Sequence, residues 1–513
     1  MINMYRDRDS VRQLISAMSG GEKRYFSKFS KSFNVTGEQP MFLQLFQYLE
    51  NAESELPKIF FESSPQALTT TKRRLYQNIL KSLRSMNEDK SIDISIGNQL
   101  ADIEILYHLN LPEQGAFIIN NTRRLAASHE RFGLLLQVLE WEKRLNIVLD
   151  KPTRSAEEIL AEEQKVLQQF RQVMDLENIY GKAKTLKKQY GYVKGKMKKN
   201  LERETIAAPA MVRLTDCLSE KARYYYYFIY ALHSWMVFDH DQAYRYSKHL
   251  LSTAAEVILP DDYIEGILEH ITSCVCMGFF EEALNGLEIS SAYMEIHKLD
   301  QSPAFVVRMF AYNSVYRLII YNYMGSRSKL RNVIKETESK LIHYEKLLSF
   351  EIRQVILGNL MNAYVGIGNL HKADEIWNSM FNKQAKTIRR DIYADLYLFR
   401  LFSLLQARNY SLLQPATLAA SRYYHKFKDA PSLFEFEMPI VNLFTKQIRL
   451  DKPEAIEELL SQIKVLIDQY NVRLKGKATF QEHYTRYLIW IDSLINNSPY
   501  NEVAAKWYKS SMV

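Results

Sequence analysis

The chain has 513 residues and a formal net charge of +8, and 47% of its residues are hydrophobic and 25% charged. These proportions are those of a folded globular protein and exclude global disorder. Because only 17 glycines and 13 prolines interrupt the chain, we expect long helices, arranged either in two or three domains or in one array of repeats.

Residues 1–90 are predicted to form a helical module of their own. Ser19 and Glu22 have the spacing of a capping box at the start of one helix. Apolar residues at helical spacing predict further helices over residues 10–18, 40–52 and 68–86. The last of these is rich in lysine and arginine. The module is therefore either a cap for the rest of the chain or a helix-turn-helix-like unit that presents a basic helix to phosphates.

Residues 91–150 are predicted to be a first helical-repeat segment. Tyr107 and Ala116 would lie on the two arms of a helical hairpin whose turn falls at residues 111–112. The helix expected over residues 131–149 is apolar on more than one face, so we expect it to be largely buried.

Residues 151–205 differ in kind, because their sparse apolar positions are typical of long, exposed helices. Pro152 breaks the chain, and Ser155 with Glu158 forms a second capping-box pattern. Between residues 182 and 203, nine basic residues stand against one Glu, a net charge of 9 − 1 = +8 that equals the charge of the whole chain. The basic excess is therefore local.

This basic block, with Tyr190 and Tyr192 among its lysines, fits a patch that binds the phosphates of a nucleic acid or an acidic protein. The alternative is a solvated helix face with a loop at residues 191–195. Because lysines predominate and arginines, which form paired hydrogen bonds to phosphates and guanine, are scarce, the block argues against sequence-specific recognition of nucleic acid. The candidate residues are Lys182, Lys184, Lys187, Lys188, Lys194, Lys196, Lys198, Lys199 and Arg203.

Residues 206–430 carry the clearest repeat, over residues 354–386. The spacing of Leu360, Tyr364, Gly368, Ala373 and Trp377 is similar to the tetratricopeptide repeat, in which a glycine turn joins two helices and a small residue lets them approach. Weaker copies place the small-residue position at 243, 283, 330 and 413, with Phe238 in place of the turn glycine in the first. The chain, with its "SGGEKRYF" stretch near the start, also resembles uncharacterised bacterial helical-repeat proteins.

The resemblance implies an all-α fold, a right-handed α-solenoid of helical hairpins with helical modules at both ends. It also implies a scaffold that holds a protein or peptide in a concave groove lined by the first helix of each hairpin. Asn362 is the best groove candidate, because a side-chain amide can pair with both a donor and an acceptor of a peptide backbone. The full set of groove candidates is Tyr225, Trp235, Thr272, Tyr312, Asn322 and Asn362. The aromatic residues among them could equally be core.

Residues 431–513 are predicted to add helices that cap the array at the C-terminal end. Residues 451–453 are a clear break and helix start, and residues 501–513 form a closing amphipathic piece.

Chemical motifs are absent from the sequence. No zinc-protease, nucleophile-elbow or phosphate-loop pattern occurs, so we expect neither an enzyme nor a cofactor. His270 and Cys274 lie four residues apart but fall at core positions of the repeat, and we interpret them as packing. Asp239, His240, Asp241 and His249 gather near a turn, where Asp commonly caps a helix, so no metal site is expected there either.

The three cysteines, Cys217, Cys274 and Cys276, are too few for a disulfide framework, and their odd number fits a reducing compartment. The N-terminus carries charges where a signal peptide needs an apolar segment. The longest apolar run, residues 224–238, is shorter than the roughly 20 residues that cross a bilayer. We therefore expect a cytoplasmic protein without a membrane span.

Overall fold

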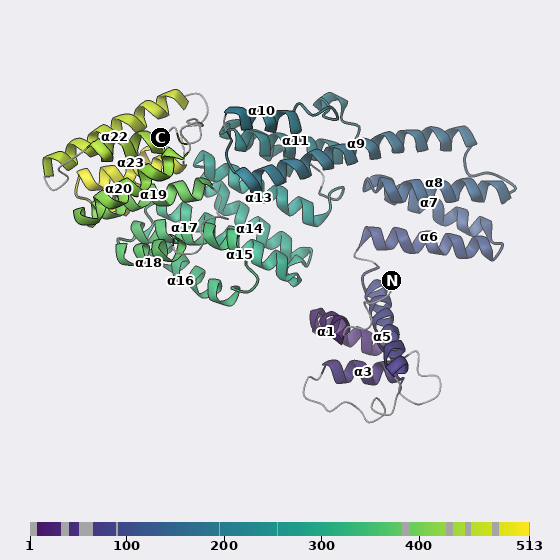
Figure 1. Cartoon of the computed structure of the whole chain (residues 1–513). Helices are drawn as coiled ribbons and strands as arrows, with labels where there is room; N and C mark the ends of the chain where they lie inside the picture. The colour runs from purple at the N-terminus through teal and green to yellow at the C-terminus, as the bar shows by residue number, and fades with distance from the viewer. Residues whose placement is uncertain are drawn as a thin grey trace. The chain divides into compact units, whose positions relative to one another are not determined.

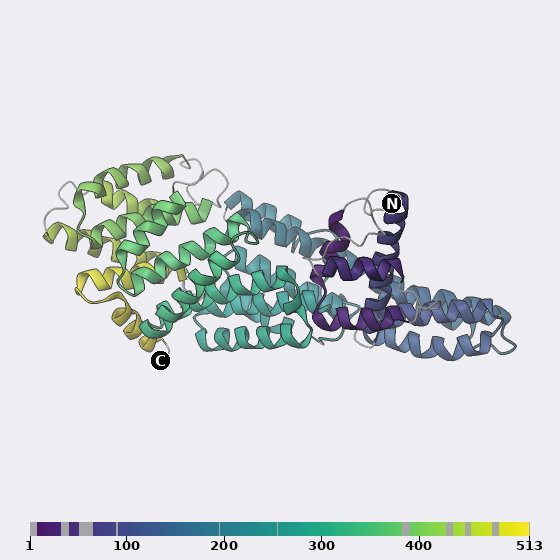
Figure 2. The ribbon, with the colours of Figure 1, turned by 90° about the horizontal axis from the view of Figure 1, so that it is seen from below.

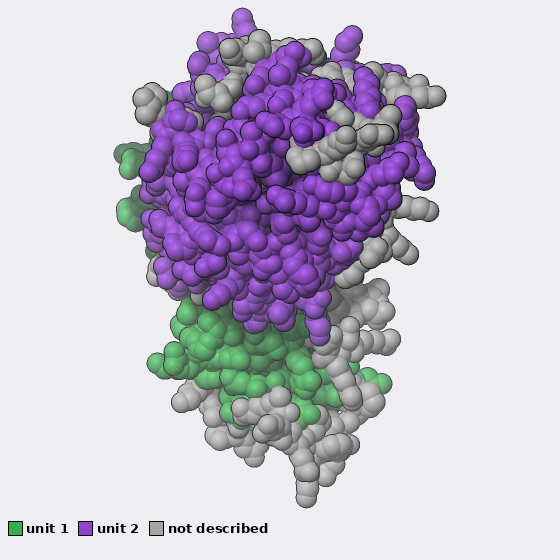
Figure 3. Space-filling view, turned by 90° about the vertical axis from the view of Figure 1, so that its left-hand side faces the viewer, with its two compact units in different colours: residues 1–170 green, residues 171–513 purple. Residues whose placement is uncertain are grey.

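The computed structural model describes residues 8–31, 40–50, 65–88, 91–193, 195–253, 255–381, 390–426, 434, 436–446, 453–474 and 482–511. Every regular element in these ranges is a helix, which confirms the predicted all-α class. None of the described helices is both long and apolar enough to cross a membrane. The chain divides into two compact units, residues 1–170 and 171–513, which Figure 3 shows in different colours.

The N-terminal helices enclose a core of their own. They are α1 (Arg8–Ala17), α2 (Gly20–Lys31), α3 (Met41–Glu50) and α5 (Pro65–Met86). Phe26 and Phe46 meet at 4.7 Å between ring centroids, and Leu75 and Ile79 are fully buried beside them. The predicted capping box is present at α2, where Ser19 N–H donates to Glu22 Oε2 at 2.7 Å and Glu22 N–H donates to Ser19 Oγ at 3.3 Å.

Three antiparallel helices follow in the first unit: α6 (Ile92–His108), α7 (Pro112–Ser128) and α8 (Phe132–Val148). The close approach in this segment is made by Gly115 rather than by Ala116, because a Cβ on Gly115 would stand 3.3 Å from Leu145. The expectation that the third helix is largely buried is wrong for its C-terminal turn. Ile147 there is 83% exposed.

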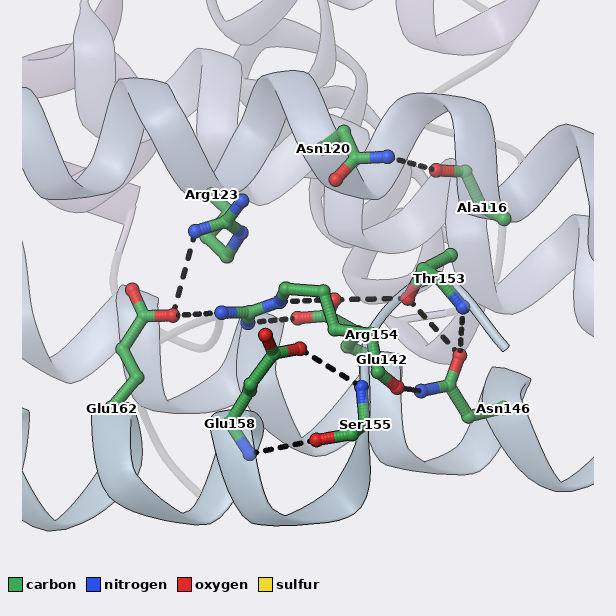
Figure 4. Close-up of polar contacts among 10 residues, drawn as sticks. All are labelled: Ala116, Asn120, Arg123, Glu142, Asn146, Thr153, Arg154, Ser155, Glu158 and Glu162. Carbon is green, nitrogen blue, oxygen red and sulfur yellow. Dashed lines mark hydrogen bonds and ion pairs between the residues drawn. The ribbon is translucent and has the colours of Figure 1, made fainter. Parts of the chain in front are cut away.

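A buried polar cluster fixes the connection from α8 to α9 (Ala156–Tyr190), as Figure 4 shows. Glu142 is completely buried, and the Arg154 guanidinium donates to both of its oxygens, at 2.9 and 2.7 Å. Thr153 Oγ1 donates to the same carboxylate, and Arg154 also reaches Glu162 at 2.6 Å. Because both carboxylates face one cation, the pKa of the Arg154 guanidinium is raised.

The second capping box is also present at this connection. Ser155 N–H donates to Glu158 Oε2 at 3.0 Å, and Glu158 N–H donates to Ser155 Oγ at 3.2 Å (Figure 4). Two orphan N–H groups of the first turn are thereby satisfied, so α9 begins where the sequence predicts.

Five helical hairpins make up most of the second unit, and Figures 1 and 2 show them following one another in chain order. The first helix of each contacts the first helix of the next: α11 with α13, α13 with α15, α15 with α17, and α17 with α19. Their bounds are α11 (Glu220–Met236), α12 (His240–Leu251), α13 (Pro260–Met277), α14 (Phe280–Ile296), α15 (Pro303–Tyr323), α16 (Arg327–His343), α17 (Phe350–Gly366), α18 (Leu370–Phe381), α19 (Arg390–Gln406) and α20 (Tyr410–His425).

The same turn joins the two helices of every hairpin. One residue adopts a left-handed backbone, with φ of 63° at Phe238, 78° at Gly278, 65° at Gly325, 81° at Gly368 and 54° at Arg408. The N–H of the next residue then donates back into the first helix, as from Asn369 to the Tyr364 carbonyl at 2.8 Å. The residues five positions after each turn, at 243, 283, 330, 373 and 413, are all 1% exposed or less. The left-handed turn positions and the buried small-residue positions that the repeat pattern predicts are therefore confirmed.

Four more helices complete the described chain: α21 (Glu437–Lys446), α22 (Pro453–Leu474), α23 (Glu482–Ile495) and α24 (Tyr500–Ser511). The closing piece does not simply extend the end of the array, because α24 contacts α15 and α17. Gly325 permits this contact, since a Cβ on it would lie 2.2 Å from the Asn501 carbonyl oxygen. Trp507 and Tyr508 on α24 pack against Tyr323 and Phe280.

Candidate functional site

The basic block covers the C-terminal end of α9, residues 191–193 and α10 (Gly195–Glu204). Most of its charges are paired. Lys187 Nζ lies 2.7 Å from Glu269, and Lys184 Nζ lies 3.2 Å from Glu265, both on α13. Weaker pairs join Lys182 to Glu204 at 3.5 Å, Lys198 to Glu202 at 3.9 Å and Arg203 to Glu204 at 3.6 Å. Acidic residues brought in by folding therefore offset the local excess that the sequence shows.

Three of the predicted lysines, Lys188, Lys196 and Lys199, are exposed and have no acidic partner within the described ranges. Lys194 lies outside the described residues. The surface left for a polyanion is thus smaller than the nine-residue patch expected from the sequence.

The stretch at residues 191–193 packs against the first hairpin and is not a solvated loop. Val193 N–H donates to the Met236 carbonyl at 2.8 Å. The Tyr192 ring stacks on Trp235 at 4.3 Å and on Phe238 at 4.0 Å, and Lys187 Nζ lies 4.4 Å from the centroid of Trp235. The Tyr192 ring therefore already stacks on two aromatic rings of the protein and is not available to stack on a nucleic-acid base. Tyr190, by contrast, is 37% exposed.

Four of the six groove candidates are buried. Tyr225 is covered by Tyr180 from α9, with 5.4 Å between ring centroids, and Trp235 is covered by Tyr192. Thr272 Oγ1 donates to the Leu268 carbonyl at 2.8 Å and contacts the Tyr316 hydroxyl at 2.6 Å. These side chains, with Asn322, are at most 8% exposed and do not line an open groove.

Asn322 is buried in the contact between α15 and α17. Its Nδ2 donates to the Asn362 carbonyl at 3.4 Å, and a Cβ on Gly366 would lie 1.8 Å from its Oδ1. Gly366 is therefore what lets the two helices approach at this level.

Asn362 and Tyr312 are the two candidates that stay partly accessible, and they lie on the neighbouring helices α17 and α15. Asn362 Oδ1 is buried but has no hydrogen-bond partner in the part of the chain that the structure describes. An unpaired buried acceptor costs roughly 1–3 kcal/mol, which a ligand donor or an ordered water would recover.

Next to Tyr312 the surface is polar and charged. Arg308 on α15 forms an ion pair with Glu265, which also binds Lys184. Glu269 beside them is buried, and its Oε1 has no partner among the described residues. Burial raises the pKa of the Tyr312 hydroxyl, so this group stays a neutral hydrogen-bond donor and acceptor.

The group near the first turn is held apart by ordinary contacts. Asp239 Oδ1 accepts from Gln242 N–H at 3.4 Å and so caps α12, as expected. Asp241 pairs with Arg245, and the His249 ring stacks on Tyr227. His240 is 3% exposed, and burial lowers its pKa to about 4.

His270 and Cys274 do lie in the core, as the repeat frame predicts, but a third residue joins them. Glu282 on α14 brings Oε1 to 3.1 Å from His270 Nε2, and Cys274 Sγ lies 3.5 Å from the same nitrogen. Sequence spacing did not suggest Glu282, although it lies four residues after the turn glycine, Gly278, and so at a fixed place in the hairpin.

Comparison with models of protein families, with curated proteins and with solved structures found no match for this chain.

Proposed function

We propose that this chain is a non-enzymatic scaffold that binds a protein or peptide along the first helices of its hairpins, and that these hairpins form a right-handed, tetratricopeptide-like solenoid. The recurring turn and the side-by-side first helices support this reading, because such an array presents one continuous surface. The binding surface in the proposal is the part of α15 and α17 around Tyr312 and Asn362, the two groove candidates that stay partly accessible.

The observation that carries the proposal is the partly accessible Asn362 carboxamide, whose Oδ1 has no hydrogen-bond partner among the described residues. A carboxamide on the side of a helix can accept from a peptide N–H while its NH₂ group donates to the next carbonyl, and this pairing reads an extended backbone without reading its side chains. The Tyr312 ring on the adjacent helix would supply apolar contact area.

The test is affinity capture from a lysate with three forms of the protein, at low and high salt. Asn362→Ala should lose a protein partner that the wild type retains at high salt. Asn378→Ala is the matched control, because Asn378 is exposed on α18 and its Nδ2 donates to the Asp374 carbonyl of the same helix, at 2.9 Å. Equal retention by all three forms would contradict the proposal.

The alternative is a nucleic-acid-associated protein or regulator that uses the basic block and the basic helix of the N-terminal module, α5. The three unpaired lysines favour a weak, salt-sensitive polyanion contact of this kind. The discriminating variant is Lys188→Gln with Lys196→Gln and Lys199→Gln, which leaves the ion pairs to α13 intact. If nuclease treatment removes everything that the wild type captures, and this variant captures nothing, the basic block and not α17 is the binding surface.

A further inference from the structure

The second hairpin of the second unit holds a cluster of metal-ligand side chains. His270 and Cys274 stand one helical turn apart on α13, and Glu282 faces them from α14. Their ligand atoms all lie within 4.8 Å of one another. His270 is 5% exposed and Cys274 is completely buried, whereas the Glu282 side chain is 39% exposed. The cluster therefore has an inner wall and one open side.

The hydrogen bonds around His270 decide which of its nitrogens is available. Ser247 Oγ on α12 donates to the Tyr244 carbonyl at 3.0 Å, so its lone pair is left to accept Nδ1–H of His270, also at 3.0 Å. In the neutral imidazole, Nε2 then carries the lone pair. This nitrogen faces Cys274 and Glu282.

Without a metal, the neutral Nε2 of His270 accepts only a weak hydrogen bond, from the Cys274 thiol at 3.5 Å. The Glu282 oxygen, which is also an acceptor, lies 3.1 Å from the same nitrogen. One cation between the three atoms would satisfy them together.

The two separations measured from His270 Nε2 match a tetrahedral metal. Zinc bonds of about 2.0 Å to nitrogen or oxygen and about 2.3 Å to sulfur place nitrogen and sulfur roughly 3.5 Å apart, and nitrogen and oxygen roughly 3.3 Å apart. The observed separations from His270 Nε2 are 3.5 Å to sulfur and 3.1 Å to oxygen. The ligand charges also match, because a thiolate and a carboxylate neutralise a divalent ion.

The outer partners of such a site are already in place. Ser247 holds Nδ1 of His270, as protein groups usually hold the second nitrogen of a metal-bound imidazole. The Tyr244 hydroxyl donates to Glu282 at 2.9 Å, and its ring stacks on His270 at 5.5 Å. Lys248 Nζ lies over the Tyr244 ring at 5.7 Å and is not among the ligand atoms.

We propose that His270 Nε2, Cys274 Sγ and a Glu282 carboxylate oxygen bind one divalent transition-metal ion, with zinc as the best match and a water at the fourth position. The ion would join α13 to α14. His270 and Cys274 would then be metal ligands and not only packing residues. This proposal does not depend on the scaffold function, since it concerns the inside of a single hairpin.

The test is titration of the intact, reduced protein with Co²⁺, followed by displacement with Zn²⁺. The wild type should bind one equivalent and show both the visible bands of tetrahedral cobalt and a thiolate-to-cobalt band in the near ultraviolet. Cys274→Ala should lose the thiolate band, whereas Cys217→Ala, the control thiol on another element, should keep it.

Glu282→Gln is the second variant, because its partly exposed side chain can be changed without opening the core. It should keep the fold by circular dichroism and weaken Co²⁺ binding by about tenfold or more. Zinc should also raise the melting temperature of the wild type more than that of Glu282→Gln. A wild type that shows no thiolate band with Co²⁺, or binds it no more tightly than Cys274→Ala, would overturn the proposal.

Discussion

His240 shows how a single buried side chain sets a pH dependence. It is 3% exposed, its Nδ1 has no partner in the described structure, and burial lowers its pKa to about 4. The unfolded chain, with an ordinary pKa near 6.5, binds the proton more readily. The contribution of His240 to stability is therefore complete above about pH 6.5 and is lost as the pH falls towards 4, by up to about 3 kcal/mol.

His240→Phe should remove that loss. A phenyl ring fits beside Tyr192 and Phe238, whose centroids lie 6.0 and 6.1 Å from the imidazole, and it carries no proton. The check is urea denaturation at pH 7 and pH 5, where the difference in unfolding free energy between the two pH values should be smaller in the variant. An unchanged difference would show that His240 does not titrate on unfolding.

Glu142 and Arg154 form the buried pair that fixes the α8–α9 connection. Glu142→Gln should destabilise this region by about 2 kcal/mol, because it removes the charge of the buried partner and leaves the partly buried Arg154 guanidinium with Glu162 as its carboxylate. Hydrogen exchange of residues 142–162 should rise accordingly. Replacing both Glu142 and Arg154 with Leu should cost less than the two single changes added together. Additive costs would mean that the two side chains do not act as a pair.

At the scale of the element, the hairpin turn gives the sharpest pair of variants. Gly368 and Arg408 occupy the same place in successive hairpins, with φ of 81° and 54°. Gly368→Ala should destabilise by about 1 kcal/mol through backbone strain alone, because no atom lies within 4 Å of the added Cβ. Arg408→Gly should stabilise by up to about 1 kcal/mol. Thermal unfolding measures both, and shifts of the same sign would contradict the equivalence of the two turns.

The ion pair from α9 to α13 gives a second element-scale prediction. Lys187→Gln should lower the unfolding free energy by about 2 kcal/mol, because it leaves the buried Glu269 unpaired and removes the cation from Trp235. Lys188→Gln, one residue away on the exposed side, should change it by less than about 0.5 kcal/mol. Urea unfolding that found equal costs would show that the contact with α13 contributes nothing.

These elements also show what could be predicted from the sequence. The positions of the hairpin turns were predictable, because the turn favours glycine and the close approach of the two helices favours a small residue. Even Phe238 could be placed at a turn, from its distance to the small residue that follows it. The sequence left open whether Tyr225 and Trp235 line a groove or belong to the core. Helical periodicity says which face of a helix is apolar, but it does not say that α9 and Tyr192 cover that face.

Across the molecule, the local charge of the sequence overstated the size of the basic surface, again because the sequence does not show tertiary contacts. The basic excess at residues 182–203 is real in the sequence, yet Glu265 and Glu269, some eighty residues later, lie against it in the fold. Counting charges along a segment cannot include partners that arrive through tertiary contacts. The same holds for Glu282, which completes the cluster at His270 and Cys274 from a different helix.

The central claim is that α15 and α17 present a surface that binds a protein or peptide. The most direct measurement places a photoreactive phenylalanine analogue at Tyr312 and, in a control, at Asn378 on α18, and identifies what each form crosslinks in a lysate treated with nuclease. The account predicts a discrete protein adduct from position 312 that is absent from position 378 and persists at high salt. Adducts that are equal at both positions, or absent from both, would contradict it.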